Sequence, residues 1–101
     1  MKAQLIIKDR VRKGGLLIER VVWEVPLPVD GCSHHFKYRL YCGRKGETVV
    51  RYDNEPGKGD HRHIGSRERQ QPYAFTTLEQ LVIDFEADVS RLSGGKDESD
   101  H

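Results

Sequence analysis

The sequence has no long apolar run, and no basic segment followed by an apolar one opens it. A helix that spans a bilayer needs about 20 consecutive apolar residues, and a secretory signal needs an apolar core behind a charged start. We therefore expect a cytoplasmic protein that neither spans a membrane nor is secreted. Cysteine is also scarce: Cys32 and Cys42 are too few and too widely separated for a disulfide framework or a zinc knuckle. Both are expected to be reduced thiols.

A strong charge of one sign is absent as well. The chain has 17 Lys and Arg against 16 Asp and Glu, a formal net charge of +1 at pH 7, which argues against a strongly electrostatic nucleic-acid binder. The charges are nevertheless unevenly placed. Basic residues outnumber acidic ones between positions 37 and 69, and acidic residues dominate from position 79 onward. We expect a cationic face and an anionic end.

The chain is also too short for two independent cores. With 101 residues, 36% of them hydrophobic and 33% charged, the composition is polar but globular, and it suits one two-layer domain. No internal repeat is present. We expect a single domain over residues 1–93 and a flexible acidic tail over residues 94–101.

Four segments favour β-strands. Residues 16–25 are rich in β-branched side chains at period two. Residues 35–42 alternate strictly, so that Lys37, Arg39 and Tyr41 share one face and the apolar side chains share the other. Residues 3–12 and 47–53 complete the set, and turns rich in glycine and proline link all four. A short fifth strand through residues 61–64 is left open.

One helix is predicted near the C-terminus. Over residues 78–92 apolar side chains recur at helical spacing, and Gly94 follows as a stop signal. Thr76 and Glu79 have the spacing of a capping box. The apolar stripe is wide enough to cover one face of a small sheet, and we expect the stripe and Trp23 to lie in the core.

The predicted fold class is therefore α+β. It is an antiparallel meander of four or five strands with one C-terminal helix packed on one face. Because one helix can shield only one face of the sheet, the other face must be polar or covered by a partner.

The segment from Arg51 to His63 concentrates groups that could carry chemistry. His61 and His63 are two residues apart, so in an extended segment both rings project to the same side. Histidine titrates near neutrality, and such a pair can divide the roles of acid and base in cleavage of RNA. Asp53 would then fix a histidine tautomer.

Neighbouring side chains suit a bound nucleic acid. Arg51, Lys58 and Arg62 would hold a phosphate and stabilise its growing charge. Tyr52 and Tyr73 offer stacking surfaces for an unpaired base.

Plainer interpretations stand beside these. A His-x-His pair in a basic loop occurs often by chance, and Asp53-Asn54 could simply open a turn that Pro56-Gly57 continues. The Lys37, Arg39 and Tyr41 face could be an ordinary solvated strand face. A metal site is a further alternative, because His61 and His63 with Asp53 or Asp60 supply ligand types that zinc accepts. A fourth recognisable ligand is missing, so we expect no metal and no cofactor.

The box Arg51-Tyr52-Asp53-Asn54, the glycine-containing basic loop behind it and the box His61-Arg62-His63 together resemble the TumE family of small bacterial toxins. Tyr73 and Phe75 precede the predicted helix, as aromatic residues do in that family. The resemblance extends from residue 2 to about residue 92, and the pairing of the two boxes is fairly specific.

The resemblance implies a toxin of a two-gene toxin–antitoxin pair, neutralised by a cognate antitoxin that carries a DNA-binding domain. By analogy with RelE-like interferases it also implies an RNA target. The residues that it marks are those of the two boxes: Arg51, Tyr52, Asp53, Asn54, His61 and His63.

The leading hypothesis from the sequence is a toxin that acts on RNA as a metal-independent ribonuclease. A non-catalytic module that docks an antitoxin or a nucleic acid through its basic sheet face is the alternative, and a metal-dependent nuclease is a third. Homodimer formation stays open.

Overall fold

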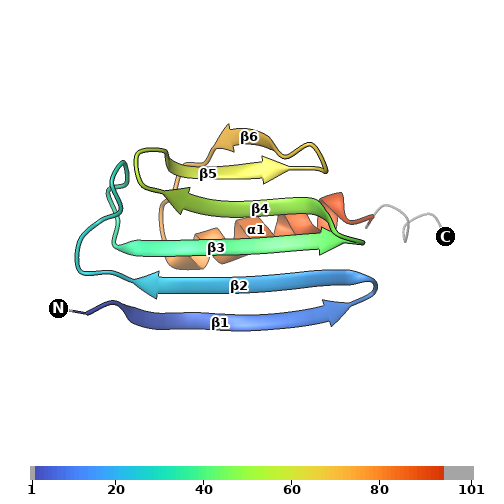
Figure 1. Ribbon diagram of the computed structural model, residues 1–101, viewed down its shortest axis with the longest axis horizontal. Coiled ribbons are helices and arrows are strands. Elements are labelled where there is room, and N and C mark those ends of the chain that lie inside the picture. Colours follow the sequence, from blue (N-terminus) through green and yellow to red (C-terminus); the bar gives the residue numbers. More distant parts are fainter. Residues whose placement is uncertain (1, 95–101) are drawn as a thin grey trace.

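The structure is a computed structural model that describes residues 2–94. Six strands form one antiparallel sheet in chain order, and a single helix follows them (Figure 1). The elements are β1 (Gln4–Lys13), β2 (Leu16–Glu24), β3 (Phe36–Arg44), β4 (Glu47–Glu55), β5 (Gly59–Ile64), β6 (Arg69–Pro72) and α1 (Leu78–Leu92). The α+β meander predicted from the sequence is confirmed, and the sheet has one strand more than expected.

The additional strand is β6, which lies in a stretch without apolar alternation. Its sequence, Arg-Gln-Gln-Pro, carries no strand signal of its own. It pairs antiparallel with β5, placing Gln70 opposite His63 and Gln71 opposite Arg62. The strand is therefore formed by a tertiary contact, because the edge of β5 supplies the hydrogen-bonding partners that local sequence cannot.

The helix occupies the residues predicted for it, but its cap differs by one position. The N-cap is Thr77, whose hydroxyl accepts a hydrogen bond from the backbone N–H of Gln80 at 3.0 Å. The capping box predicted at Thr76 is therefore wrong. Thr77 is extended, with φ −135° and ψ 162°, as an N-cap residue should be. A side-chain oxygen three residues before a free N–H is what capping requires, and Thr77 meets that requirement.

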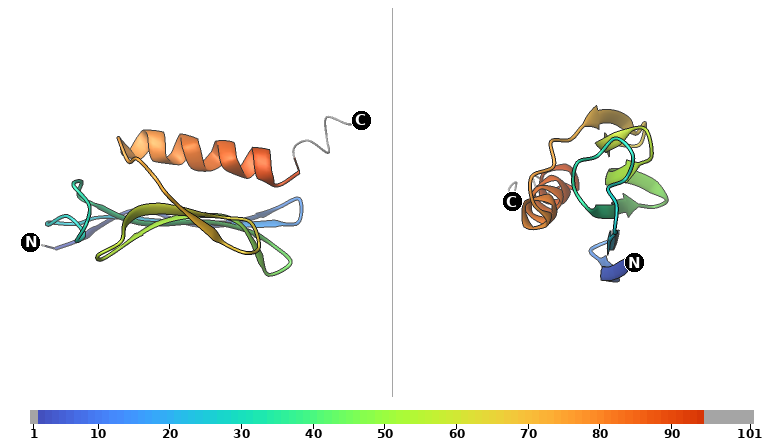
Figure 2. Two further views of the ribbon diagram at one scale, coloured as in Figure 1. Left: turned by 90° about the horizontal axis from the view of Figure 1, so that it is seen from above. Right: turned by 90° about the vertical axis from the view of Figure 1, so that its left-hand side faces the viewer.

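The core lies between α1 and the middle of the sheet (Figure 2). Helix α1 packs mainly on β4 and also on β3. The fully buried apolar side chains come from β2, β3, β4 and the helix: Val22, Tyr38, Leu40, Cys42, Val50, Tyr52, Leu81 and Phe85. The helical stripe predicted for the core thus covers one sheet face, as expected.

A polar group ties the helix to the sheet within this core. The hydroxyl of Tyr52 donates to Oδ2 of Asp88, and Nη1 of Arg62 approaches the same oxygen at 2.7 Å. Burial pushes the pKa of Asp88 upward, but the hydrogen bonds from Tyr52 and Arg91 outweigh burial and lower it. Burial also raises the pKa of Tyr52 to about 12. Asp88 is therefore an ionised, fully partnered anchor.

The opposite face of the sheet has no helix on it, and we call it the helix-free face. It carries the side chains that alternate with the core residues: Lys37, Arg39, Tyr41, Arg51, Asp53, His61 and His63. Trp23 also lies on this face, opposite Lys37, and is 38% exposed. The prediction that Trp23 belongs to the core is wrong, because alternation along β2 turns it away from α1.

The remaining expectations concern the thiols, the membrane and the tail. Cys32 and Cys42 are both free thiols, as predicted. Within the part of the chain that the structure describes, no helix has the length and apolarity needed to cross a membrane. The predicted acidic tail lies, apart from Gly94, outside the described residues.

Candidate functional site

The β4–β5 hairpin brings the two sequence boxes together on the helix-free face. In the register of this hairpin Asp53 lies opposite His61, and Arg51 lies opposite His63. Because alternate residues of paired strands face the same side, all four side chains share one patch. Asp53, His61 and His63 form its centre, and we call these three residues the Asp53 cluster.

The Asp53 cluster is compact and buried. Nε2 of His61 lies 2.7 Å from Oδ1 of Asp53, and Nε2 of His63 lies 3.9 Å from the same oxygen. The two imidazole rings meet edge to face, with centroids 4.9 Å apart. His61 is 2% exposed and His63 9%. The His-x-His pair therefore shares one carboxylate oxygen, and His63 and Asp53 lie nearer the surface than His61 does.

The three atoms that meet here have no hydrogen-bond partner among residues 2–94: Oδ1 of Asp53, Nε2 of His61 and Nε2 of His63. The 2.7 Å contact lacks the geometry of a hydrogen bond. Leaving a buried polar atom unsatisfied costs about 1–3 kcal/mol. Three such atoms at one point are a feature that stability alone does not explain.

The outer nitrogens of both rings do have partners. Nδ1 of His61 faces the backbone carbonyl of Gly59 at 3.1 Å, and Nδ1 of His63 faces that of Glu68 at 3.4 Å. A carbonyl oxygen can only accept, so each Nδ1 carries the proton and each Nε2 presents a lone pair. The backbone thus sets the tautomer of both rings.

Arg51 and Glu68 brace the cluster from the side. Nε of Arg51 donates to Oδ2 of Asp53 at 3.1 Å, and Nη1 reaches Oε1 of Glu68, also at 3.1 Å. The hydroxyl of Thr48 donates to Oε2 of Glu68 at 2.6 Å. This hydrogen bond lowers the pKa of Glu68, with the charge of Arg51 adding to the effect against burial. Glu68 is therefore held as an anion that fixes the guanidinium.

Glu68 and Thr48 were not found from the sequence. Glu68 has a positive φ of 51° in the turn between β5 and β6, a conformation that costs a non-glycine residue about 1–2 kcal/mol. That conformation lets Glu68 supply both a carboxylate to Arg51 and a carbonyl to His63. No spacing in the sequence signals this, because the contact depends on the β5–β6 turn.

A close backbone crossing holds the carbonyl that faces His61. Gly59 has φ +72°, and a Cβ at this position would lie 3.1 Å from the carbonyl oxygen of Gly31. Gly31 has φ +94° and meets the backbone of Gly59 in return. Both positions therefore require glycine, and the β2–β3 loop is held against the start of β5.

Three of the predicted site residues lie on the other face of the sheet. Tyr52 is fully buried under α1, so its ring is not open to a base. Arg62 points to the same side and contacts Tyr52 and Asp88. Asn54 is 1% exposed, accepting from the N–H of Tyr38 and donating to the carbonyl of Phe36. Strand alternation places all three away from the Asp53 cluster.

The remaining predicted residues lie around these two groups. Tyr73 packs edge-on against Tyr52 at 5.0 Å and donates to Asp84 at 2.6 Å, on the helix side. Lys58 lies in the β4–β5 turn and pairs with Glu55 at 3.4 Å. Lys37, Arg39 and Tyr41 stay on the helix-free face, where register puts Arg39 beside Asp53 and Tyr41 beside Arg51.

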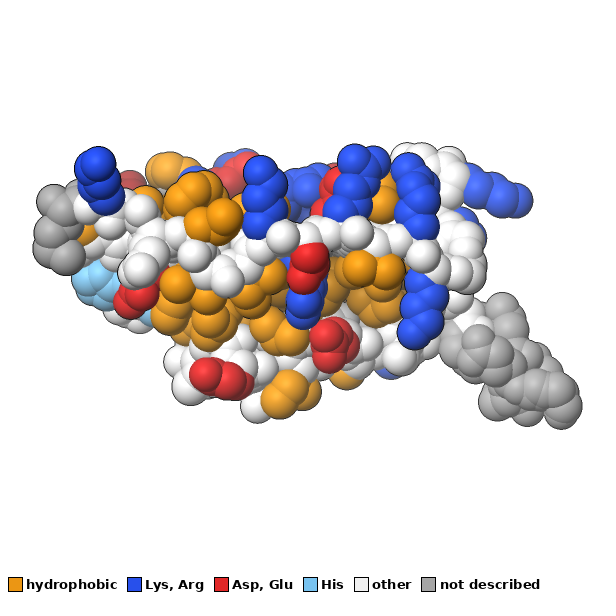
Figure 3. All heavy atoms as spheres, turned by 90° about the horizontal axis from the view of Figure 1, so that it is seen from below, with side chains coloured by type: hydrophobic (Ala, Val, Ile, Leu, Met, Phe, Trp, Pro, Cys, Tyr) orange, Lys and Arg blue, Asp and Glu red, His pale blue; other side chains and the backbone are white. Residues whose placement is uncertain are grey.

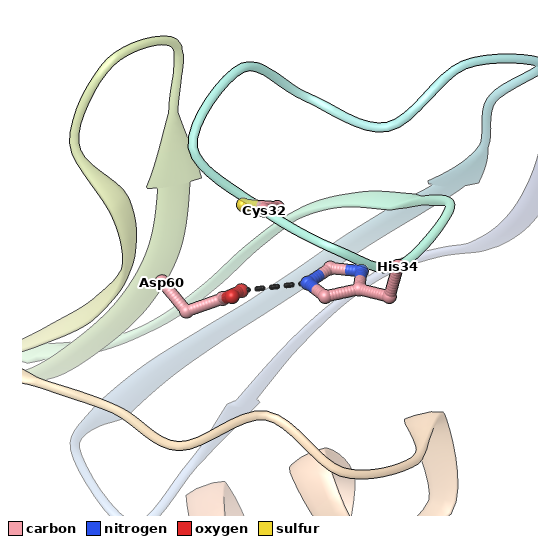
Figure 4. Close-up of side chains that lie close together, drawn as sticks. All are labelled: Cys32, His34 and Asp60. Atoms are coloured by element: carbon pink, nitrogen blue, oxygen red, sulfur yellow. Dashed lines mark hydrogen bonds and ion pairs between the residues drawn. The ribbon is translucent and has the colours of Figure 1, made fainter.

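A second group of metal-ligating side chains lies at the β2–β3 loop: Cys32, His34 and Asp60 (Figure 4). Here the acceptors and donors are matched. His34 takes a hydrogen bond from the N–H of Phe36 on Nδ1, so Nε2 carries the proton and donates to Asp60 at 2.8 Å. Tyr38 also donates to Asp60, at 2.6 Å.

Cys32 is a poor candidate for a nucleophile or a metal ligand. Burial and the charge of Asp60 raise the pKa of its thiol, which disfavours the thiolate that a nucleophile or a metal ligand needs. Asp60, considered from the sequence as an alternative ligand beside the two histidines, belongs to this group instead. The satisfied group is structural, and the Asp53 cluster differs from it in having unmatched atoms.

A comparison with protein families identifies the family of the chain. The family model described as toxin TumE matches residues 2–93. The chain belongs to the TumE toxin family. No curated protein and no solved structure matches the chain. The family match spans every strand and the helix, and the TumE resemblance expected from the two boxes is confirmed.

Membership in the TumE family gives the chain a place in a class of toxins and leaves its chemistry to be argued from the site. The geometry separates the two boxes into two roles. Asp53, His61 and His63 meet on the helix-free face, and the alternating residues of the same boxes build the core beneath α1. We therefore take the Asp53 cluster as the candidate functional site of this TumE-family chain.

Proposed function

We propose that this toxin acts on RNA and cleaves it at the Asp53 cluster. The observation that carries the proposal is the meeting of one carboxylate and two imidazoles on the helix-free face of a toxin-family fold. Cleavage of a phosphodiester requires a proton to be taken from the attacking oxygen and charge to be stabilised on the phosphate. Such a group supplies both, either by its side chains or through a cation that they hold.

A basic strip beside the cluster supports the choice of RNA as the substrate. Lys and Arg side chains stand along the helix-free side of the sheet (Figure 3). Register places Lys8 in line with Arg39 across Val21, and Arg39 lies beside Asp53. We call Lys8 and Arg39 the basic strip. Cationic side chains in a row match a phosphate backbone, and the exposed ring of Trp23 offers a stacking surface for an unpaired base.

The alternative function, a non-catalytic binding module, rests on the burial of the histidines. A general acid or base must come within hydrogen-bonding reach of the substrate, and His61 is 2% exposed. If neither histidine reaches RNA and the cluster holds no cation, the basic strip remains as a surface that binds RNA or an acidic segment without cleaving. Cleavage products distinguish the two functions.

The proposal includes a protein partner. A toxin of this family is expected to pair with a cognate antitoxin that carries a DNA-binding domain and is encoded beside it. The basic helix-free face is the surface we assign to an acidic segment of that antitoxin, so that neutralisation would also block access to RNA.

Controlled expression tests the biological half of the proposal. Induction of the wild-type chain should arrest growth, and co-expression of the neighbouring gene should relieve the arrest. The Asp53→Asn variant, at equal soluble expression, should allow growth. His35→Gln is the matched control, because His35 is exposed and lies in the β2–β3 loop, outside the cluster.

The purified wild-type chain tests the chemical half. Incubation with a mixed RNA substrate should yield discrete shorter products, resolved on a denaturing gel. Intact RNA that shifts in a binding assay would instead establish the binding module. Unimpaired growth together with intact and unbound RNA would contradict both functions.

A further inference from the structure

We propose that the Asp53 cluster is a binding site for a divalent transition-metal cation of the zinc type, with Asp53, His61 and His63 as its protein ligands. The proposal takes the place of the acid–base assignment expected from the sequence. The role of the cation in RNA cleavage rests on the proposed function, whereas its binding does not.

The lone pairs of the cluster point toward one another. Each Nδ1 carries a proton toward a backbone carbonyl, so both Nε2 atoms present lone pairs toward Oδ1 of Asp53. Oδ1 is itself an acceptor. Three acceptors that face one another repel unless a positive charge lies between them. One metal cation would accept a lone pair from all three atoms at once.

Protonation of one histidine satisfies these three atoms less completely than a bound metal cation would. Protonation of His61 at Nε2 would give one donor toward Asp53, but the 2.7 Å contact is not aligned as a hydrogen bond. Nε2 of His63 would keep no partner within residues 2–94. The ligand atoms of the cluster all lie within 4.8 Å of one another, which is close enough for one ion to contact each after small adjustments.

Each of the three ligands has a hydrogen-bonding contact behind it. A metal-bound histidine characteristically donates its other N–H to a carbonyl or carboxylate, and a metal-bound carboxylate is itself hydrogen-bonded. His61 and His63 face the carbonyls of Gly59 and Glu68, and Asp53 accepts from Arg51. Every ligand of the cluster is therefore oriented by its surroundings.

The group at the β2–β3 loop differs from the Asp53 cluster in both respects. Cys32, His34 and Asp60 are also close enough to hold an ion, but His34 uses Nδ1 as an acceptor and Nε2 as a donor. That ring has no lone pair free for a metal. The tautomers of the rings and the buried atoms without a hydrogen-bond partner both favour a metal at the Asp53 cluster. Neither favours one at Cys32, His34 and Asp60.

The chemistry of the donors indicates the class of cation. Two imidazoles and one carboxylate suit Zn²⁺ and its late first-row neighbours, and not Ca²⁺ or Mg²⁺, which prefer oxygen ligands. Three protein ligands leave a coordination position for water or for a phosphate oxygen of the substrate. The side chains of His63 and Asp53 are 11% and 10% exposed, against 2% for His61, so we expect that position to be reached from the side of His63 and Asp53.

Titration of the untagged, chelator-stripped full chain with ZnCl₂ tests the site without RNA. Calorimetry should show one Zn²⁺ bound per chain near neutral pH. Binding should weaken as the pH is lowered, because protons compete with the cation for the ligand atoms. His63→Gln and Asp53→Asn should abolish it, and His35→Gln should bind as the wild type does.

The bracing contact gives a graded variant. Arg51→Gln keeps all three ligands and removes the charge that orients Asp53, so zinc affinity should fall by about 10–100-fold. Absence of zinc binding by folded wild-type protein would overturn the site. Equal binding by the wild type and by His63→Gln would also overturn it.

The RNA assay separates this inference from the proposed function. If zinc binds in the cluster and RNA stays intact, the metal site stands and the ribonuclease proposal fails. If chelator-stripped protein that binds no zinc still cleaves RNA at the full rate, the ribonuclease proposal stands and the metal site fails. Loss of cleavage on stripping, restored by Zn²⁺, supports both.

Discussion

Asp53 is the side chain on which the contacts of the candidate site converge. One of its oxygens accepts from Arg51, and the other faces both histidines. The backbone sets the tautomer of both histidines, because the carbonyls of Gly59 and Glu68 accept from the two Nδ1–H groups. Each ring therefore turns the lone pair of Nε2 toward Asp53. The character of the cluster therefore depends on two backbone groups whose residues need a positive φ.

Gly59 gives the most direct test of this backbone control. Gly59→Ala places a Cβ 3.1 Å from the carbonyl oxygen of Gly31 and forces a positive φ on alanine. We expect the free energy of unfolding to fall by about 1–3 kcal/mol and zinc binding to weaken, because the carbonyl that orients His61 shifts. Chemical denaturation and zinc titration measure the two effects.

Gly57→Ala is the matched control. Gly57 also has a positive φ, of 84°, but a Cβ there would meet nothing within 4 Å. Gly57→Ala should lower the free energy of unfolding by about 1–2 kcal/mol, the cost of a positive φ for alanine, and should keep zinc binding. Equal effects of the two variants would show that the crossing with Gly31 does not control the site.

Among the secondary-structure elements, the β4–β5 hairpin explains why only four of the twelve predicted site residues meet in one patch. Alternation sends Arg51, Asp53, His61 and His63 to the helix-free face. It sends the residues between them to the helix side, where they build the core and the Asp88 anchor: Tyr52, Asn54, Asp60 and Arg62.

The pairing of the two histidines on one side followed from their spacing, and their meeting with Asp53 followed from a register that the sequence had not fixed. The fifth strand was open from the sequence, because Asp60 and Arg62 interrupt the apolar pattern that signals a strand. Once that strand is drawn, the hairpin places Asp53 opposite His61.

Asp88 adds a polar contact between helix α1 and the sheet, and this gives a prediction about pH. Asp88→Asn should lower the free energy of unfolding by about 1.5–3 kcal/mol at neutral pH, the range for hydrogen bonds to a charged group. The folded-state pKa of Asp88 lies below its ordinary value of 3.8. Its contribution is therefore fully present above about pH 4 and is lost as the pH falls through the folded-state pKa.

Urea unfolding at neutral pH and at about pH 3 should accordingly show a gap between wild type and Asp88→Asn that narrows on acidification. Glu86→Gln is the control on the same helix, since Glu86 is 62% exposed and pairs with Arg20 at 3.6 Å. It should change stability by about 0.5 kcal/mol or less. A gap for Asp88→Asn that widens at acid pH would contradict the assignment.

For the whole molecule, two layers and an elongated outline, 51 × 24 × 23 Å, follow from one helix that packs on a six-stranded sheet and runs along the direction of its strands. The strand and helix periodicities predicted this arrangement, because apolar spacing reports which faces are buried. They did not predict β6 or the outward position of Trp23. Both depend on tertiary neighbours: the free edge of β5, and the lack of a helix over one face.

The helix-free face accordingly combines features that the exposed face of a sheet usually lacks. The Asp53 cluster, in which three buried atoms have no hydrogen-bond partner among residues 2–94, lies beside a strand that carries basic side chains. Trp23 is exposed on the same face. An RNA strand would cover the basic strip and reach the cluster from the side of His63. The central claim is thus that Asp53, His61 and His63 carry the activity of this toxin.

The rate of RNA cleavage by Asp53→Asn, measured in single turnover beside the wild type and His35→Gln, tests that claim most directly. The substitution keeps the size of the side chain and removes the charge that both histidines face. Circular dichroism would confirm that each variant is folded. We predict a rate about 10²–10⁴-fold below that of the wild type, with His35→Gln unchanged. Cleavage by folded Asp53→Asn at the wild-type rate would contradict the claim.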